Sequence, residues 1–307
     1  MQDWLIIVNP NAGCRQGIKD WEIIERAIHS SNIKGKICFT EYKFHAVDIV
    51  KENAAEGYRK IIAVGGDGTI NEIVNGIFSF SPEKVNEFTL GVIPIGTGND
   101  WCKMFNIPDT YNEAVQVIEK GSSILQDVGF VEYFENEKAI QRYFVNVAGL
   151  GFDAIVLKKA NEEKEKGKFG KFLYFKNILS NLMKFDYLPT ELSFNNDVKK
   201  IDLFSMNIGI CKYSGNGMMQ VPNAIADDGL FDVTVIKRMS KLDVMLNVKN
   251  LYDGSFVRNK HVETHRTSEL TINGTKKLRL EVDGEYIGIA PFKFSILEKA
   301  LRIIVNA

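Results

Sequence analysis

The sequence predicts an α/β fold of two domains, a doubly wound α/β domain over residues 1–125 and a mostly antiparallel, β-rich domain over 126–307. The chain has 307 residues, and one domain usually takes about 100–200. The first part alternates apolar runs with amphipathic stretches, the pattern of parallel strands covered by helices. The second part consists mainly of runs rich in Val, Ile, Phe and Thr between turn residues, which is typical of antiparallel strands.

The strands of the first domain are continuous apolar runs, with amphipathic helices between them. In the first helix Ile18, Trp21, Ile24 and Ile28 recur at helical spacing. Gly57 is placed to end the second helix, because glycine readily adopts the left-handed conformation found after helix C-termini. The predicted strands cover residues 4–8, 36–40, 60–64 and 89–93, and the predicted helices cover 17–31, 46–57, 70–78 and 111–120.

The second domain is predicted from strand-like runs that two helical stretches interrupt. A last run over 301–305 is assignable to either domain. The predicted strands cover 128–135, 142–148, 190–194, 200–210, 231–236, 270–272, 277–282 and 291–296, and the predicted helices cover 169–185 and 241–254.

Composition excludes several classes of protein. The net charge is −1, from 38 basic and 39 acidic residues, so we expect no nucleic-acid partner. The four cysteines form no metal-ligand spacing and are expected to be reduced thiols of a cytoplasmic protein. The first residues lack the basic start and long apolar run of a signal peptide, and no run approaches the 18 apolar residues of a membrane span.

Three glycine-rich turns follow three predicted strands, over residues 9–13, 65–69 and 94–100. In an open α/β sheet such turns lie at the carboxyl ends of the strands, where ligands bind. Glycine lets the backbone approach an anion closely, and the N-terminus of the following helix offers N–H groups and a positive dipole end. A phosphate-rich ligand fits this pattern, although the chain contains no GxxxxGK[ST] phosphate loop.

The order of five motifs resembles the catalytic signature of the diacylglycerol kinase family of lipid kinases, and is most similar to its bacterial, single-catalytic-unit members. GGDGT alone also occurs in NAD kinases and phosphofructokinases, whereas the whole series is specific and covers essentially the full chain. The motifs are Asn9-Pro-x-x-Gly13, Gly65-Gly-Asp-Gly-Thr-Ile-Asn-Glu72, Pro94-Ile-Gly-Thr-Gly-Asn-Asp100, Ala226-Asp-Asp-Gly-Leu-Phe-Asp232 and Val282-Asp-Gly-Glu285.

The resemblance implies transfer of the γ-phosphoryl group of ATP to a lipid hydroxyl with Mg²⁺. The first domain then binds the nucleotide and the second presents the lipid acceptor. Asp67 and Asp100 are the residues implied to hold Mg²⁺, which prefers oxygen ligands and takes few from the protein. The implied nucleotide-binding residues are Asn9, Pro10, Asn11, Ala12, Gly13, Thr40, Gly65, Gly66, Asp67, Gly68, Thr69, Asn71, Glu72, Gly96, Thr97, Asn99 and Asp100.

Asp283 and Glu285 are the candidate proton acceptors, and Asp67 is counted with them as catalytic. In an extended segment residues two apart point the same way, so both carboxylates would face the cleft between the domains. The alternative is an Asp-Gly hairpin turn, for which this dipeptide is a strong signal. The sequence does not distinguish which of the two accepts the proton.

The motif that ends in Asp232 implies a second, structural Mg²⁺. Asp228 would supply a side chain, and carbonyls near Ile225 and Leu230 would add oxygens. A solvated acidic turn is the alternative.

Two rival functions stay open at this point: an NAD kinase, and a catalytically inactive lipid-binding regulator. The acceptor lipid cannot be read from the sequence, and a homodimer is left open. A lipid substrate requires docking at a membrane surface, and the segment over 158–184 is the candidate because it holds eight lysines and three glutamates with apolar residues at helical spacing. The alternative is that its apolar side packs on the β-rich domain.

Overall fold

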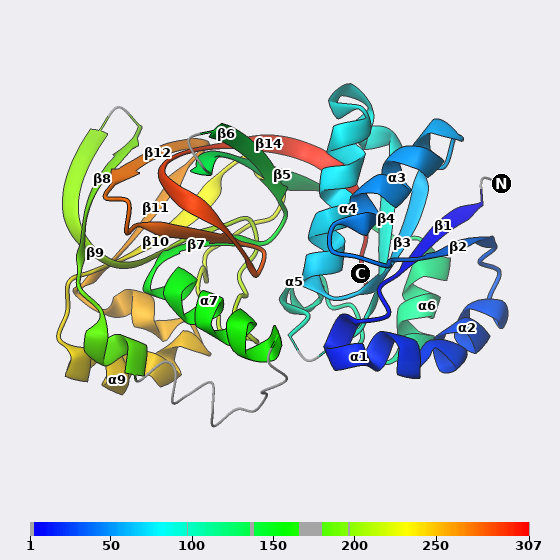
Figure 1. The fold of residues 1–307 in the computed structure, drawn as a ribbon, viewed down its shortest axis with the longest axis horizontal. Helices are drawn as coiled ribbons and strands as arrows, with labels where there is room; N and C mark the ends of the chain where they lie inside the picture. The colour runs from blue at the N-terminus through cyan, green and yellow to red at the C-terminus, as the bar shows by residue number, and fades with distance from the viewer. Residues whose placement is uncertain (1–2, 97, 136–137, 166–179, 196, 307) are drawn as a thin grey trace.

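Two lobes lie side by side along the long axis of the molecule, one with helices around a parallel sheet and one built mainly of strands (Figure 1). The computed structural model describes residues 3–96, 98–135, 138–165, 180–195 and 197–306. The predicted fold class is confirmed. Thr97 and most of the segment 158–184 lie outside the described residues.

The N-terminal lobe has four parallel strands in the order β2, β1, β3, β4. The strands are β1 (Trp4–Val8), β2 (Gly35–Phe39), β3 (Lys60–Gly65) and β4 (Thr89–Pro94). The helices are α1 (Ala12–Lys19), α2 (Trp21–His29), α3 (His45–Ala55), α4 (Asp67–Phe80), η1 (Pro82–Glu87), α5 (Asp100–Met104) and α6 (Tyr111–Lys120).

Helices cover both faces of this sheet, which explains its continuous apolar strands. Leu5 and Ile7 of β1 belong to the core cluster that contains the buried faces of α3 and α4. Ile6 and Val8 alternate with them and belong to a second cluster with residues of α2 and α6. Successive side chains of a strand point to opposite faces, so every residue of β1 after Trp4 must be apolar.

The C-terminal lobe is mostly antiparallel, as predicted. Its central strands follow the order β11, β10, β9, β7, β13, β14, and β14 pairs in turn with β4. The strands are β5 (Ser123–Glu135), β6 (Lys138–Phe144), β7 (Val147–Gly151), β8 (Leu188–Phe194), β9 (Asp197–Gly209), β10 (Phe231–Lys237), β11 (Val262–Thr267), β12 (Glu269–Gly274), β13 (Arg279–Val282) and β14 (Glu285–Ile304). The helices are α7 (Phe152–Glu165), α9 (Lys241–Asn247), η2 (Val248–Leu251) and η3 (Ser255–Arg258).

Strand β14 connects the two lobes and crosses between them at the top of Figure 1. Its end pairs in parallel with β4, with Ile303 opposite Leu90, and antiparallel with β5. The prediction of two separate strands here was wrong. The polar residues between the predicted strands form a register shift against β5, in which Lys299 has a positive φ of 49°, rather than a loop.

Several further elements differ from the prediction. The helix predicted over 17–31 is divided at Asp20 into α1 and α2, and α1 contains three non-helical residues, 13–15. The strand predicted over 142–148 is divided into β6 and β7. The helix predicted over 241–254 ends as α9 at Asn247 and continues as the 3₁₀ turn η2. Helix α7 and strand β11 were not predicted.

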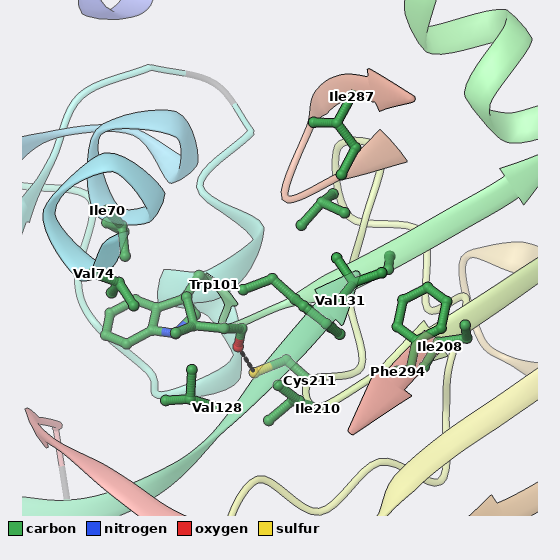
Figure 2. Close-up of a cluster of buried hydrophobic side chains, with 14 of the residues drawn as sticks. Ile70, Val74, Trp101, Val128, Val131, Ile208, Ile210, Cys211, Ile287 and Phe294 are labelled. Atoms are coloured by element: carbon green, nitrogen blue, oxygen red, sulfur yellow. Dashed lines mark hydrogen bonds between the residues drawn. The ribbon is translucent and has the colours of Figure 1, made fainter. Parts of the chain in front are cut away.

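The apolar core is continuous from one lobe to the other. Trp101 of α5 is 1% exposed and lies near Ile70 and Val74 of α4 and Val128 of β5 (Figure 2). Its indole N–H donates to Gln126 Oε1 at 3.0 Å, so this buried donor is paired. Trp101 therefore joins the start of α5 to strand β5 of the C-terminal lobe. No helix in the described part of the chain is both long and apolar enough to span a membrane.

Candidate active site

The three glycine-rich turns meet at one edge of the sheet, because β1, β3 and β4 are parallel neighbours. A Cβ atom on Gly13 would lie 3.2 Å from the Cα of Gly96, and one on Gly66 would lie 3.3 Å from the Ile95 carbonyl oxygen. Asn9 Nδ2 donates to Thr69 Oγ1 at 2.9 Å, which joins the first turn to the second. The turns thus form one backbone-lined cradle.

The first turn has an unusual backbone. Gly13, Cys14 and Arg15 all have positive φ angles, of 59°, 60° and 70°. For a residue other than glycine the left-handed conformation costs about 1–2 kcal/mol, so two such residues in succession are strained. Strain of this kind is typical of segments that hold a ligand.

Asp67 joins the second turn to the third. It is the first residue of α4, and its carboxylate accepts the N–H groups of Asp100 and Trp101, both at 3.2 Å. These bonds cap the start of α5. Burial raises the pKa of Asp67, and the two backbone hydrogen bonds act against that rise.

Asp100 faces the other lobe. Its carboxylate accepts the N–H of Asn216 at 2.8 Å and that of Gly217 at 2.6 Å, where residues 215–217 all have positive φ. Burial, partly opposed by these bonds, raises the pKa of Asp100 to about 6, and the nearby charge of Asp67 adds to the rise. Asp100 therefore attaches a loop of the C-terminal lobe to the nucleotide edge.

Thr40 and Asn99 are buried beside the turns. The Thr40 N–H donates to the Val8 carbonyl at 2.9 Å, and Asn99 Nδ2 donates to the Gly96 carbonyl at 3.1 Å. These bonds shape the backbone of the first and third turns.

Asn71 and Glu72 lie on α4, and both form hydrogen bonds with other parts of the protein. Asn71 is fully buried, and its Oδ1 accepts the guanidinium of Arg142. Glu72 accepts the N–H groups of Phe44 at 3.0 Å and Ala46 at 3.3 Å, which satisfies the start of α3. Burial raises the pKa of Glu72, and these hydrogen bonds oppose it. Contact of either residue with a nucleotide stays a prediction.

Asp283 and Gly284 form the two-residue turn of the β13–β14 hairpin, with φ angles of 47° and 83°. The expectation of an extended segment was wrong, because the Asp-Gly pair adopts its preferred turn instead. The two carboxylates accordingly point to different surroundings.

The Asp283 carboxylate is enclosed by donors. It accepts three successive backbone N–H groups of residues 145–147, at 3.0, 2.9 and 3.2 Å, and Asn71 Nδ2 at 2.8 Å. These bonds explain the break between β6 and β7, since N–H groups bound to a side chain do not join a ladder. Burial raises the pKa of Asp283 to about 6 despite them.

Glu285 points to the second glycine turn. Its Oε1 lies 3.9 Å from the position of a Cβ atom on Gly68, and its Oε2 accepts Lys43 Nζ at 2.6 Å. The side chain of Glu285 is 29% exposed. Lys43 follows β2, and no motif in the sequence pointed to it.

A cavity of about 160 Å³ begins beside this hairpin and extends through the C-terminal lobe. Gly284 and Glu281 line one part of it, and Val248, Leu251 and other apolar side chains line the rest. Burial raises the pKa of both Asp153 and Glu281, and Asp153 accepts hydrogen bonds from Ser205 and Asn207.

The polar part of this cavity is rich in acceptors. Asn207 Oδ1 and Gln220 Oε1 are buried without a hydrogen-bond partner, and both residues line the cavity. Such orphaned oxygens favour a ligand that donates hydrogen bonds. Sequence reasoning missed Asp153 and Glu281, because neither lies in a glycine turn.

The loop that was predicted to hold a second Mg²⁺ is bound by protein groups. Asp228 Oδ1 accepts the Leu230 N–H at 3.1 Å, its Oδ2 pairs with the Arg266 guanidinium, and Ile225 is exposed. Among the described residues, no group of three His, Cys, Asp or Glu side chains has a geometry that could hold a metal. A site made largely of carbonyl oxygens stays a prediction.

A parallel sheet edge with a glycine cradle, faced by a carboxylate hairpin and an apolar cavity, defines a two-lobed phosphotransferase that acts on an apolar substrate. The model of the diacylglycerol kinase catalytic domain matches residues 3–131, and that of the YegS C-terminal NAD kinase beta sandwich-like domain matches 146–305. The chain therefore belongs to the diacylglycerol kinase family and is a lipid kinase, as the motif series implied.

Individual relatives agree over nearly the full length. A diacylglycerol kinase from Staphylococcus aureus (strain bovine RF122 / ET3-1) is 28% identical over 299 residues, covering 97% of this chain and 90% of its own. The crystal structure of a diacylglycerol kinase from Bacillus anthracis str. Sterne has a similar fold, with a TM-score of 0.73, 20% identity, and coverage of 99% and 97%. Yeast NADH kinase complexed with NADH is a more distant structure, with a TM-score of 0.55, 10% identity, and coverage of 100% and 84%.

Proposed function

We propose that this lipid kinase transfers the γ-phosphoryl group of ATP, with Mg²⁺, to the hydroxyl of a diacylglycerol-like lipid. The lobe over 1–125 would bind the nucleotide and the lobe over 126–307 the lipid. The observation that carries the proposal is the position of Glu285: its carboxylate lies at the glycine cradle beside Gly68, and the residue before it, Gly284, lines the apolar cavity.

The cradle fits a polyphosphate. The first and third turns approach so closely that a Cβ atom on Gly13 would meet Gly96. Helix α4 begins directly after Gly66, so its N-terminal N–H groups lie at the same edge. The buried carboxylate of Asp67 repels those of Asp100 and Asp283 here. Mg²⁺ would neutralise phosphate charge, and it needs only one or two protein carboxylates besides the phosphates. Asp67 is the proposed ligand.

We assign the proton-accepting role to Glu285 and an orienting role to Asp283. The four donors around Asp283 hold its carboxylate toward the protein interior, whereas the carboxylate of Glu285 lies at the phosphate turn. A base must lie within hydrogen-bond reach of the acceptor hydroxyl, so the position of Glu285 is the better one. Lys43 would hold the Glu285 side chain in place.

The cavity supports a lipid acceptor. Most of its lining residues are apolar, and its polar part faces the hairpin that carries Glu285. An acyl chain in the apolar part would leave the hydroxyl end of the lipid beside the acceptor oxygens of Asp153 and Asn207. NAD has no long apolar group to occupy such a cavity.

The test is a transfer assay with labelled ATP. We expect Mg²⁺-dependent phosphorylation of dioleoylglycerol and no labelling of NAD. Glu285→Gln should lower turnover by at least about 10²-fold, the scale of a lost general base, with unchanged ATP binding. The matched control is Glu269→Gln, an exposed carboxylate at the start of β12, which pairs with β14 away from the cradle and the cavity. Labelling of NAD but of no lipid would refute the proposal.

A structural Mg²⁺ at Asp228 is a second proposal for the same chain. The carboxylates of Asp127 and Asp232 both lie close enough to Asp228 for its charge to raise their pKa values, after the larger effect of burial. Such an excess of negative charge is what a divalent cation neutralises. In the structure the guanidinium of Arg266 neutralises this charge by pairing with Asp228 and Asp232, so Mg²⁺ would compete with Arg266.

A further inference from the structure

Helix α9 and the turn η2 carry apolar side chains on two opposite sides. Val244, Val248 and Leu251 line the cavity, together with Asn247. On the other side Leu242, Met245 and Leu246 are 64%, 45% and 64% exposed. Residues three or four apart share one side of a helix, so each set forms a continuous stripe. A surface helix normally presents polar residues to water, and this one does not.

Met183 enlarges the exposed stripe. It is 60% exposed, and its carbonyl oxygen accepts Lys241 Nζ, which places it beside the start of α9. We call Met183, Leu242, Met245 and Leu246 the outer patch. Clustered exposed apolar side chains mark interaction surfaces, whereas scattered ones do not.

Positive charges border the outer patch. Lys184 follows Met183, and Lys249 lies one turn beyond Met245; both lysines are exposed. Two nearby carboxylates have partners of their own. That of Asp243 accepts the Ser240 hydroxyl at 2.6 Å, and that of Asp202 lies 3.7 Å from the Arg238 guanidinium. An apolar stripe with cations around it fits the interface of an anionic bilayer.

We propose that the outer patch enters the surface of an anionic membrane, and that α9 and η2 form the wall past which an acyl chain moves from the bilayer into the cavity. The inference rests on the proposed lipid acceptor and adds its route of entry. The inference rests on the two apolar stripes of α9 and η2. With the outer patch in a bilayer, only this one element would separate the apolar interior of the membrane from the apolar cavity.

The test changes Leu242 and Leu246 to Ser together. Both side chains are largely exposed, so the fold should survive. The matched control is Ile23→Ser with Val198→Ser, which removes exposed apolar side chains elsewhere, 50% and 63% exposed. The probes are vesicles of phosphatidylglycerol and phosphatidylcholine, long-chain diacylglycerol in those vesicles, and dioctanoylglycerol as dispersed monomers.

We expect the α9 double variant to bind vesicles about tenfold or more weakly, which corresponds to about 1.4 kcal/mol. It should phosphorylate vesicle-bound diacylglycerol poorly and monomeric dioctanoylglycerol normally, while the control variant matches the wild type. Vesicle binding equal to that of the wild type would overturn the inference. An equal loss of phosphorylation of vesicle-bound diacylglycerol and of monomeric dioctanoylglycerol would also overturn it, because α9 would then affect only the cavity.

A second copy of the chain could cover the outer patch instead of a membrane, and the test distinguishes the two. If light scattering shows a dimer that the double change dissociates, the outer patch is a subunit interface and the inference is wrong. Failure of the proposed function is separable: a wild-type protein that phosphorylates no lipid refutes that function, while vesicle binding still reports on the outer patch.

Discussion

The amide Nδ2 of Asn71 lies 2.8 Å from the carboxylate Oδ2 of Asp283, although the two residues are 212 positions apart. Asn71 lies on the helix that follows the second glycine turn, and Asp283 lies in the hairpin turn before Glu285. One hydrogen bond thus fixes the carboxylate hairpin of one lobe against the phosphate edge of the other. Both groups are buried, so its loss is not compensated by water.

Replacing Asn71 by Ala should therefore lower both stability and turnover. The change leaves Arg142 and one lone pair of Asp283 without their partner, and a buried unsatisfied group costs about 1–3 kcal/mol. Urea denaturation gives the loss of unfolding free energy, and the transfer assay gives the turnover. Asn75→Ala is the control, because Asn75 bonds the backbone of Tyr143 on the same helix side without contacting Asp283. Equal turnover in the two variants would show that the contact does not position the hairpin.

The raised pKa of Asp283 predicts how stability depends on pH. Its pKa is about 6 in the folded protein against an ordinary value of 3.8, so the folded state binds the proton more tightly. Stability from this group is therefore full below about pH 4 and declines as the pH rises to about 6, by up to about 3 kcal/mol.

Asp283→Asn removes this titration. The amide among four donors has a cost that does not depend on pH. Between pH 4 and pH 7 the wild type should therefore lose unfolding free energy relative to the variant. Urea denaturation at the two pH values measures the shift. A difference that does not change with pH would mean that Asp283 titrates in the native state as it does in the unfolded chain.

The cradle can be tested with one methyl group at Gly68. A Cβ atom there meets nothing nearer than Glu285 Oε1, at 3.9 Å, so Gly68→Ala fits the protein without a clash. Alanine favours a helix over glycine by about 1 kcal/mol, so the thermal midpoint should stay or rise. The methyl group would occupy the space proposed for phosphate oxygens, and we expect ATP affinity to fall at least about tenfold, as calorimetric titration would show. Wild-type affinity would place the phosphates elsewhere.

The fold and the glycine cradle could be predicted because their signals are local. Each of the three turns follows an apolar run, and parallel strands necessarily bring such turns to one edge. The strand break at Val145 and Asn146 was not predictable, since its cause is a carboxylate far along the chain. Similarly, Asp153 and Glu281 become neighbours of one cavity only through the pairing of β7, β9 and β13.

The two readings of the Asp-Gly-Glu motif show the same limit. In the sequence, a hairpin turn at Asp-Gly and carboxylates that face the cleft were alternatives. The structure contains the turn, and Glu285 still lies at the cradle. The turn directs Asp283 inward, and a sequence has no local signal for that direction.

The final prediction concerns Asp228, Arg266 and Mg²⁺. A cation that binds only the native state stabilises it by mass action, by about 2.7 kcal/mol at a concentration of 100 times Kd. For a chain of this size each kcal/mol raises the thermal midpoint by about 1–2 °C. We expect Mg²⁺ to raise the midpoint of the wild type and to have no such effect on Asp228→Ala. Because Arg266 occupies the carboxylate in the structure, Arg266→Leu should bind Mg²⁺ more tightly than the wild type and reach its full midpoint shift at a lower concentration. Scanning calorimetry across a Mg²⁺ series, with Ca²⁺ as a second divalent cation, measures all three proteins. If Arg266→Leu responds as weakly as Asp228→Ala, the loop is an acidic turn that an arginine neutralises and holds no metal.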